Sequence, residues 1–147
     1  MAIQSLDTTF KSVTDRLGPG AYYVIRAKAE AATDITYSAV PFKGKLVRAL
    51  FCNGATAMAA ANNYRVGIVN ASNSDAVMAA STADGANDFG GTSYSGDYTA
   101  AYGTEAITLS STAASLAVDE GDTIEITMTV EGTVTDANVL LYFEAIP

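Results

Sequence analysis

Three carboxylates around one glycine are the chain's strongest candidate for chemistry. Asp119, Glu120 and Asp122 flank Gly121 in LAVDEGDTIEITMTV, residues 116–130. Clustered carboxylates can bind a cation, but acid–base catalysis needs two of them in distinct environments of one cleft. Asp and Gly also supply the backbone geometries of tight turns, and charged side chains at a strand end stay solvated. We therefore interpret the cluster as a turn before a strand rather than a catalytic or metal site.

The chain contains no histidine, which removes most common catalytic arrangements. Histidine bases, Ser-His-Asp triads, Cys-His pairs and nearly all zinc sites depend on it. Glycoside hydrolysis by two carboxylates stays possible, although no tryptophan is present to line a sugar cleft. The single cysteine, Cys52, excludes an intrachain disulfide and lies in an apolar pattern that predicts a buried structural thiol. We predict a protein that is not an enzyme and has no cofactor.

A second oxygen-rich group consists of Asp84, Asn87 and Asp88. An EF-hand loop needs oxygen ligands at positions 1, 3 and 5 and a glycine at position 6. Counted from Asp84, the third residue is Ala86 and the sixth is Phe89, so the pattern fails. We predict a turn-rich loop here and no metal site.

Length and composition are typical of one folded domain, with 147 residues of which 49 % are hydrophobic. No run of about 18 apolar residues and no charged leader before an apolar block occurs, so we expect neither a transmembrane helix nor a secretory signal. Folding in the cytoplasm of the producing cell follows from this expectation. The net charge of −8 disfavours nucleic-acid binding, which needs clustered Lys and Arg.

Charge is distributed unevenly along the chain. Residues 1–65 carry eight basic and four acidic side chains, a net charge of +4, whereas residues 66–147 carry twelve acidic side chains and no basic one. Strands from both halves can interleave, which would make the asymmetry accidental. Alternatively, the surface is polarised and meets partners or sister subunits by charge complementarity.

From Ala21 onward, alternating patterns predict strands. In one of them Tyr23, Ile25 and Ala27 share a face, and in another Ile124, Ile126 and Met128 do. About eight such stretches, separated by turn signals, predict an all-β antiparallel sandwich or barrel. They are residues 21–30, 34–40, 44–54, 62–70, 74–81, 105–111, 121–132 and 137–147.

The first 20 residues form a separate arm in this interpretation, followed by a β-sandwich domain over residues 21–147. Apolar residues recur at spacings of three and four and would form one stripe on a short helix, although the Thr-rich middle also allows an extended arm. The stripe consists of Ile3, Leu6, Phe10, Val13 and Leu17, and a Gly-Pro-Gly sequence ends the segment. The arm either packs on its own domain or reaches a neighbouring subunit.

Residues 83–105 form a long stretch rich in Gly, Ser, Asp and Tyr. Loops this long are usually functional or mobile, and rigid tyrosines among small polar residues are typical of binding loops. The stretch is either a solvated loop whose tyrosines fold back on the domain or a contact loop. The candidate contact residues are Phe89, Tyr94, Tyr98 and Tyr102.

The C-terminal strand is apolar on both faces. Val139, Leu141 and Phe143 share one face, while Leu140, Tyr142 and Ile146 share the other. In a small antiparallel sandwich only one face of a strand meets the core. The second face must be covered by another subunit or by the N-terminal arm, so Leu140, Tyr142 and Ile146 are the predicted oligomer interface.

The C-terminal third, SLAVDEGDTIEITMTVEGTVTDANVLLYFEAIP, resembles the closing strands of small tailed-bacteriophage virion proteins, above all capsid decoration (cement) proteins. In that pattern a strand that begins near Gly-Asp, a short turn and an apolar strand ending near a proline complete a jelly-roll-like sandwich. The upstream stretch VPFKGKLVRALFCNGA is also similar.

The resemblance implies a structural virion protein. It would lie on the outer capsid surface, bind the major capsid protein, bridge coat subunits and form a homotrimer, without contacting nucleic acid or membrane. The basic N-terminal part is the expected capsid-docking element, with Phe10, Lys11 and Arg16 as candidates. The alternative is a receptor- or glycan-binding module of a phage fibre or tail that works through the Tyr-rich loop.

Overall fold

The computed structural model of the chain describes residues 22–29, 33–59, 61–81, 86–89, 100–133 and 136–146. The predicted N-terminal arm therefore lies outside the described residues. Within these ranges the chain is mostly antiparallel β-structure, with one short helix, α2 (Ala113–Leu116). None of the described helical structure is long and apolar enough to cross a membrane.

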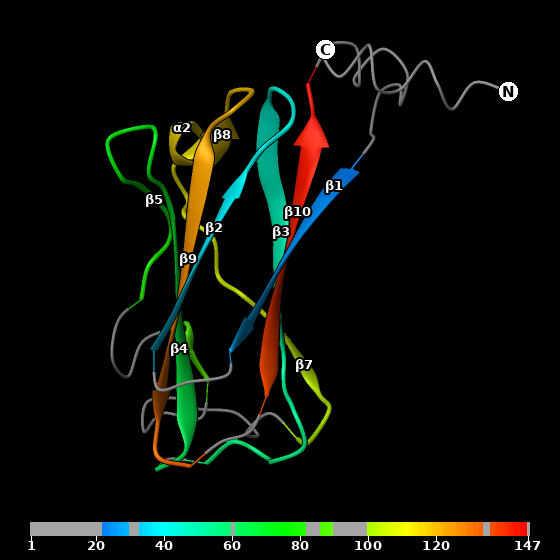
Figure 1. Ribbon diagram of the computed structural model, residues 1–147, viewed down its shortest axis with the longest axis vertical. Helices are drawn as coiled ribbons and strands as arrows, with labels where there is room; N and C mark the ends of the chain where they lie inside the picture. The colour runs from blue at the N-terminus through cyan, green and yellow to red at the C-terminus, as the bar shows by residue number, and fades with distance from the viewer. Residues whose placement is uncertain are drawn as a thin grey trace, which may run out of the picture.

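Two antiparallel sheets pack face to face (Figure 1). Sheet A has the order β1 (Tyr22–Ala29), β10 (Ala137–Ala145), β3 (Gly44–Cys52) and β7 (Thr104–Ala106), and the short β8 (Ala117–Val118) also pairs with β3. Sheet B has the order β2 (Thr33–Ala39), β9 (Thr123–Glu131), β4 (Asn63–Asn70) and β5 (Ala76–Ala79), and the short β6 (Asp88–Phe89) also pairs with β4.

The eight main strands pair in order from the two ends of the chain toward its middle. β1 pairs with β10, β2 with β9, β3 with β7, and β4 with β5. A long antiparallel ribbon that rolls up in this way gives the two sheets of a jelly roll. The predicted all-β antiparallel sandwich is thus confirmed as a jelly-roll-like fold, and each of the eight predicted stretches overlaps one main strand.

The core lies between the sheets and follows the predicted alternation. On β9 the side chains of Ile124, Ile126 and Met128 are buried, and their neighbours of opposite parity are half-buried. An aromatic cluster fills one part of this core: Phe51 stacks on Phe89, with ring centroids 4.5 Å apart, and also contacts Tyr64. Contact between inner faces of the two sheets is what holds the sandwich together.

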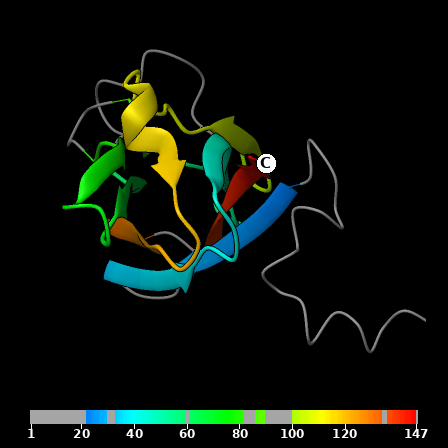
Figure 2. The same ribbon diagram turned by 90° about the horizontal axis from the view of Figure 1, so that it is seen from above.

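The two edges of the sandwich differ. Figure 2 shows β1 and β2 side by side along one edge, whereas α2 and the segment before it lie across the other. On that second edge Ser110 donates a backbone hydrogen bond to Met78 of β5 (2.7 Å), and the chain then returns to sheet A through β8. The segment from residue 107 to residue 118 therefore closes the second edge.

Candidate functional site

The acidic turn at residues 119–122 is a structural device. The Asp122 carboxylate accepts hydrogen bonds from the Asn70 amide (2.7 Å) and from the backbone N–H of Asp119 (2.9 Å). Gly121 has a φ of +87°, a conformation that suits glycine, and donates to the carbonyl of Val40 (2.8 Å). Asp122 thus joins the end of β4 to the turn before β9. The carboxylate of Asp122 is therefore engaged in hydrogen bonds within the protein. Among the described residues, no three His, Cys, Asp or Glu side chains are grouped to hold a metal ion.

Replacing Asp122 by alanine should lower the free energy of unfolding by about 2 kcal/mol, because the buried Asn70 amide and the backbone N–H of Asp119 lose their acceptor. Glu120→Ala, at an exposed position of the same turn, should change it by less than about 0.5 kcal/mol. Urea unfolding of both variants measures the difference, and equal effects would contradict the structural role of Asp122.

Cys52 is half-buried on β3 rather than fully buried. Burial raises the pKa of its thiol, an effect that the nearby Arg26 guanidinium partly offsets. A raised pKa keeps the thiol protonated near neutral pH, and a protonated thiol is a poor nucleophile. The prediction of a structural thiol therefore agrees with its electrostatic environment.

The predicted contact residues fall in different places. Phe89 is only 1 % exposed and stacks on Phe51, so its prediction as a loop contact residue is wrong: its ring is part of the core. Tyr102 is 78 % exposed and points away from the core. The other predicted positions lie outside the described residues: Phe10, Lys11, Arg16, Tyr94 and Tyr98.

The second face of β10 is largely apolar and is not fully buried. Leu140 and Tyr142 are half-buried there, and Ile146, just beyond the strand, is 40 % exposed. Strand register brings further apolar side chains beside them, since Val24 pairs with Tyr142 and Leu50 with Leu140. We call this surface the outer face of sheet A.

A β-bulge shapes a hollow in this face. The register between β10 and β3 shifts after Tyr142, so that both Val47 and Arg48 reach the outer face. With Tyr22 and Tyr142 they line a shallow hollow of about 430 Å³. The Arg48 guanidinium lies 5.9 Å from the centroid of the Tyr142 ring, within range of a cation–π interaction.

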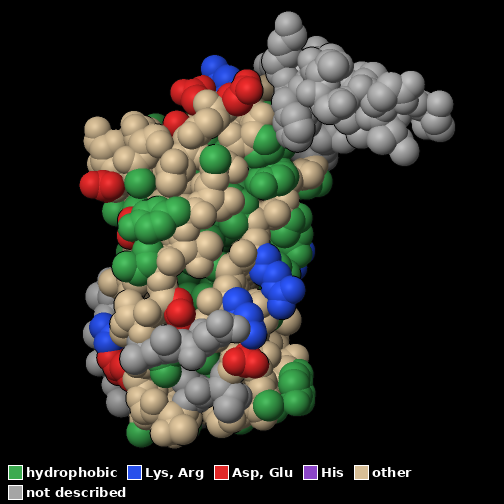
Figure 3. All heavy atoms as spheres, in the orientation of Figure 1, with side chains coloured by type: hydrophobic (Ala, Val, Ile, Leu, Met, Phe, Trp, Pro, Cys, Tyr) green, Lys and Arg blue, Asp and Glu red, His purple; other side chains and the backbone are tan. Residues whose placement is uncertain are grey.

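Cations surround the apolar part of the outer face of sheet A. Lys28 and Lys45 have acidic neighbours, Asp136 at 4.0 Å and Glu144 at 3.9 Å. Arg26 donates to the Asn138 side chain, and neither Arg26 nor Arg48 pairs with a carboxylate among the described residues. Figure 3 looks onto the β1 edge of this face, where hydrophobic side chains lie beside a group of Lys and Arg side chains. The face is therefore positive within a chain of net charge −8.

Sheet B presents a different outer face. Along β9 its half-buried outer residues are polar: Thr123, Glu125, Thr127 and Thr129. Exposed apolar side chains on this face include Ile35 and Tyr37 of the edge strand β2, opposite Thr127 and Glu125. Apolar side chains framed by arginine are typical of protein interfaces, where Tyr and Arg often contribute most of the binding energy. Of the two outer faces, that of sheet A is the candidate docking surface.

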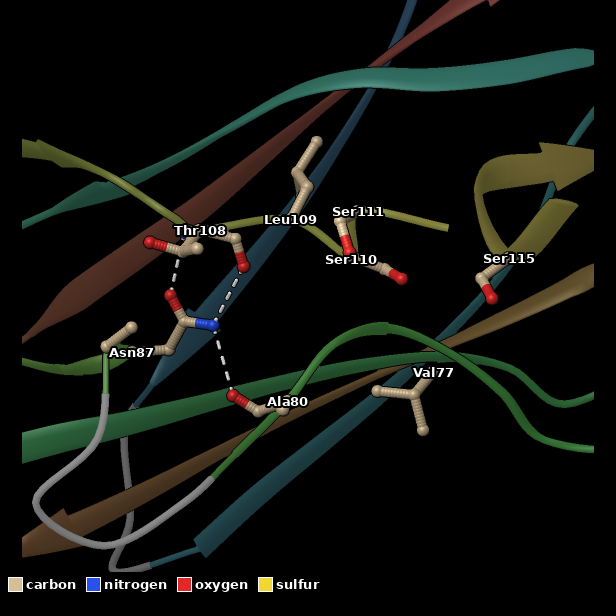
Figure 4. Close-up of a pocket in the computed structure, with 9 residues that line it drawn as sticks. Val77, Ala80, Asn87, Thr108, Leu109, Ser110, Ser111 and Ser115 are labelled. Carbon is tan, nitrogen blue, oxygen red and sulfur yellow. Dashed lines mark hydrogen bonds between the residues drawn. The ribbon is translucent and has the colours of Figure 1, made fainter. Parts of the chain in front are cut away.

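A second hollow, of about 550 Å³, opens beside the closed edge of the sandwich (Figure 4). Asn87 is buried, with 2 % of its surface exposed. Its side-chain amide donates to the carbonyls of Ala80 and Thr108 (3.0 Å each). Its oxygen accepts from the N–H of Thr108 (2.8 Å). The Asn87 side chain thus joins Ala80, just after β5, to Thr108. The described lining of the hollow also carries four hydroxyls, of which that of Ser110 accepts from the N–H of Thr112: Thr108, Ser110, Ser111 and Ser115.

These hydroxyls were not among the predicted site residues, because serines spread over a polar stretch carry no distinctive spacing. Comparison with family models, curated proteins and solved structures found no match to this chain.

Proposed function

We propose that the protein is a structural virion component that binds the outside of a bacteriophage capsid and stabilises it by bridging coat subunits. The observation that carries the proposal is the outer face of sheet A, which is apolar, has arginines at its border and is not covered by the described part of the chain. The jelly-roll-like fold supports it by analogy only, because viral capsid domains share this fold with lectins and other proteins of unrelated function.

The mechanism of this proposed function is mechanical. A face that docks across adjoining coat subunits binds the assembled capsid and not the separated subunits. Binding to one state alone shifts the equilibrium toward that state by mass action. Apolar side chains such as Val24 and Leu50 supply buried area, and Arg26 and Arg48 supply hydrogen bonds to acidic groups of the coat.

Co-sedimentation with empty heads of the source virus tests the proposal. The chain should pellet with intact heads in a fixed ratio to the coat protein and stay in the supernatant with dissociated coat subunits. Heads carrying it should also dissociate at a higher temperature or denaturant concentration. A chain that stays in the supernatant in the presence of intact heads would sink the proposal.

The hydroxyl-lined hollow favours a second candidate function, a glycan-binding module of a fibre or tail. Its described lining is uncharged and combines hydroxyls with the apolar side chains of Val77 and Leu109, a composition suited to a neutral sugar. Nuclear magnetic resonance titration with neutral oligosaccharides should then shift the amide signals of Thr108 and Ser115. Shifts confined to other surfaces, or none, count against this function.

A further inference from the structure

Among the strands that the structure describes, β2 pairs with another strand on only one side of its backbone. It is an edge strand of sheet B, bonded on its other side to β9. Val40 donates to the carbonyl of Asp122 (2.9 Å), and hydrogen bonding alternates along an antiparallel ladder, so the even-numbered residues of β2 bond to β9. The N–H and C=O groups of the odd-numbered residues point to the open edge: Thr33, Ile35, Tyr37 and Ala39.

This edge has few of the features that usually prevent strand pairing. Proteins commonly protect sheet edges by shortness, proline or charge, and β5 and β7 are short, with four and three residues. β2 has seven residues, and its outward side chains are uncharged, with Ile35 52 % and Tyr37 62 % exposed. The neighbouring Glu125 charge, with a hydrogen bond from the phenol, raises the pKa of Tyr37, which keeps the ring neutral.

We propose that β2 pairs with β2 of a second copy of this chain, antiparallel, about a two-fold axis at Thr36. In this register Ile35 lies opposite Tyr37 of the second copy, and the same pair recurs on the other side of the axis. Pairs of an aromatic and a β-branched side chain stabilise antiparallel sheets. Asp34, the only charged residue of β2, lies opposite Ser38, so no like charges meet.

Backbone geometry supports a second copy as the occupant. In the register centred on Thr36, each odd-numbered residue faces another odd-numbered residue, so outward N–H and C=O groups meet outward groups along the whole strand. A shift by two residues would place Ile35 opposite itself and shorten the overlap. The strand is therefore complementary to itself in backbone polarity, side-chain pairing and charge.

The paired edge shares no residue with the outer face of sheet A, so the inference does not depend on the proposed capsid role. Two-fold pairing predicts a dimer, whereas the resemblance to decoration proteins implies a trimer. The docking face would stay free in this dimer.

A disulfide cross-link tests the register. In a Cys52→Ser background, Thr36→Cys places a thiol next to its own symmetry mate, at a Cβ–Cβ distance of about 5 Å. Ser38→Cys is the matched control: it is half-buried on the same face, but its symmetry mate lies roughly 13 Å away along the strand. Mild oxidation should convert most Thr36→Cys protein to covalent dimer and little of the Ser38→Cys protein. Equal cross-linking of the two, or none in either, overturns the register.

Native mass spectrometry tests the pairing itself and does not depend on the cysteine variants folding. The wild-type chain should have twice the mass of one chain. An Ile35→Lys/Tyr37→Lys double variant puts ammonium groups opposite each other at both pairs and should have the mass of one chain. A wild-type monomer, a wild-type trimer or a dimer that persists in the double variant overturns the inference.

Discussion

A Val24→Glu/Arg48→Glu double variant should bind empty heads at least about 100-fold more weakly than the wild-type chain, which corresponds to ~2.7 kcal/mol. Val24 is 45 % exposed in the apolar part of the outer face of sheet A, and Arg48 lies over the Tyr142 ring. A buried carboxylate at position 24 would have no partner, and reversal at position 48 would repel the acidic groups that we expect on the coat. Equilibrium co-sedimentation measures the change.

Val77→Glu is the matched control, because Val77 is 47 % exposed and lies on β5 of sheet B. It introduces the same side chain at a similar exposure but away from the proposed docking surface, so head binding should change less than about threefold. Wild-type binding should also weaken as ionic strength rises, since Arg26 and Arg48 are exposed charges. If Val77→Glu weakens binding as much as the double variant does, the docking surface has been assigned to the wrong sheet.

Asn87→Ala should cause the largest loss of stability among single polar substitutions at described positions, about 3–5 kcal/mol. The substitution removes three hydrogen bonds of a buried amide and leaves the carbonyls of Ala80 and Thr108 and the N–H of Thr108 without their side-chain partner. It also loosens the attachment of the 107–110 segment, which closes one edge of the sandwich. Urea or thermal unfolding measures the loss.

Asn73→Ala provides the comparison, because Asn73 is exposed in the turn between β4 and β5. Its replacement should change the free energy of unfolding by less than about 0.5 kcal/mol. An Asn87→Ala protein as stable as Asn73→Ala would show that the buried amide does not hold the edge.

The longer strands could be predicted because buried apolar side chains alternate along them with more exposed ones. On β9 and β10, alternation of apolar with polar or half-buried residues reflects one face packed against the opposite sheet. β6 and β8 have two residues each and α2 has four, too few for any period to show. Their positions depend on tertiary contacts, such as the pairing of β8 with Gly44 and Lys45.

The candidate site was only partly predictable. Residues 139–146 are apolar on both faces of the strand, which indicated that the face away from the core is an interface. Leu140 and Tyr142 do lie on the outer face of sheet A. Val24 and Arg48 could not be assigned to the same surface, because β1 and β3 meet β10 only through long-range pairing and a bulge.

Two further residues have roles that depend on contacts with distant parts of the chain. Phe89 looks like a loop residue because it follows Gly- and Asp-rich sequence, but its ring completes the aromatic cluster with Phe51. The turn interpretation of residues 119–122 agrees with the structure, yet only the structure shows that Asp122 binds Asn70, a residue 52 positions earlier.

Hydroxyl-radical footprinting of the chain on intact heads tests the central claim most directly. Tyr22 and Tyr142 line the hollow in the outer face of sheet A, and Tyr102, which is 78 % exposed, lies outside that face and serves as the internal reference. Our account predicts that binding to heads lowers the labelling of Tyr22 and Tyr142 several-fold while Tyr102 stays as reactive as in the free chain. Unchanged labelling of Tyr22 and Tyr142 on head-bound protein would contradict it.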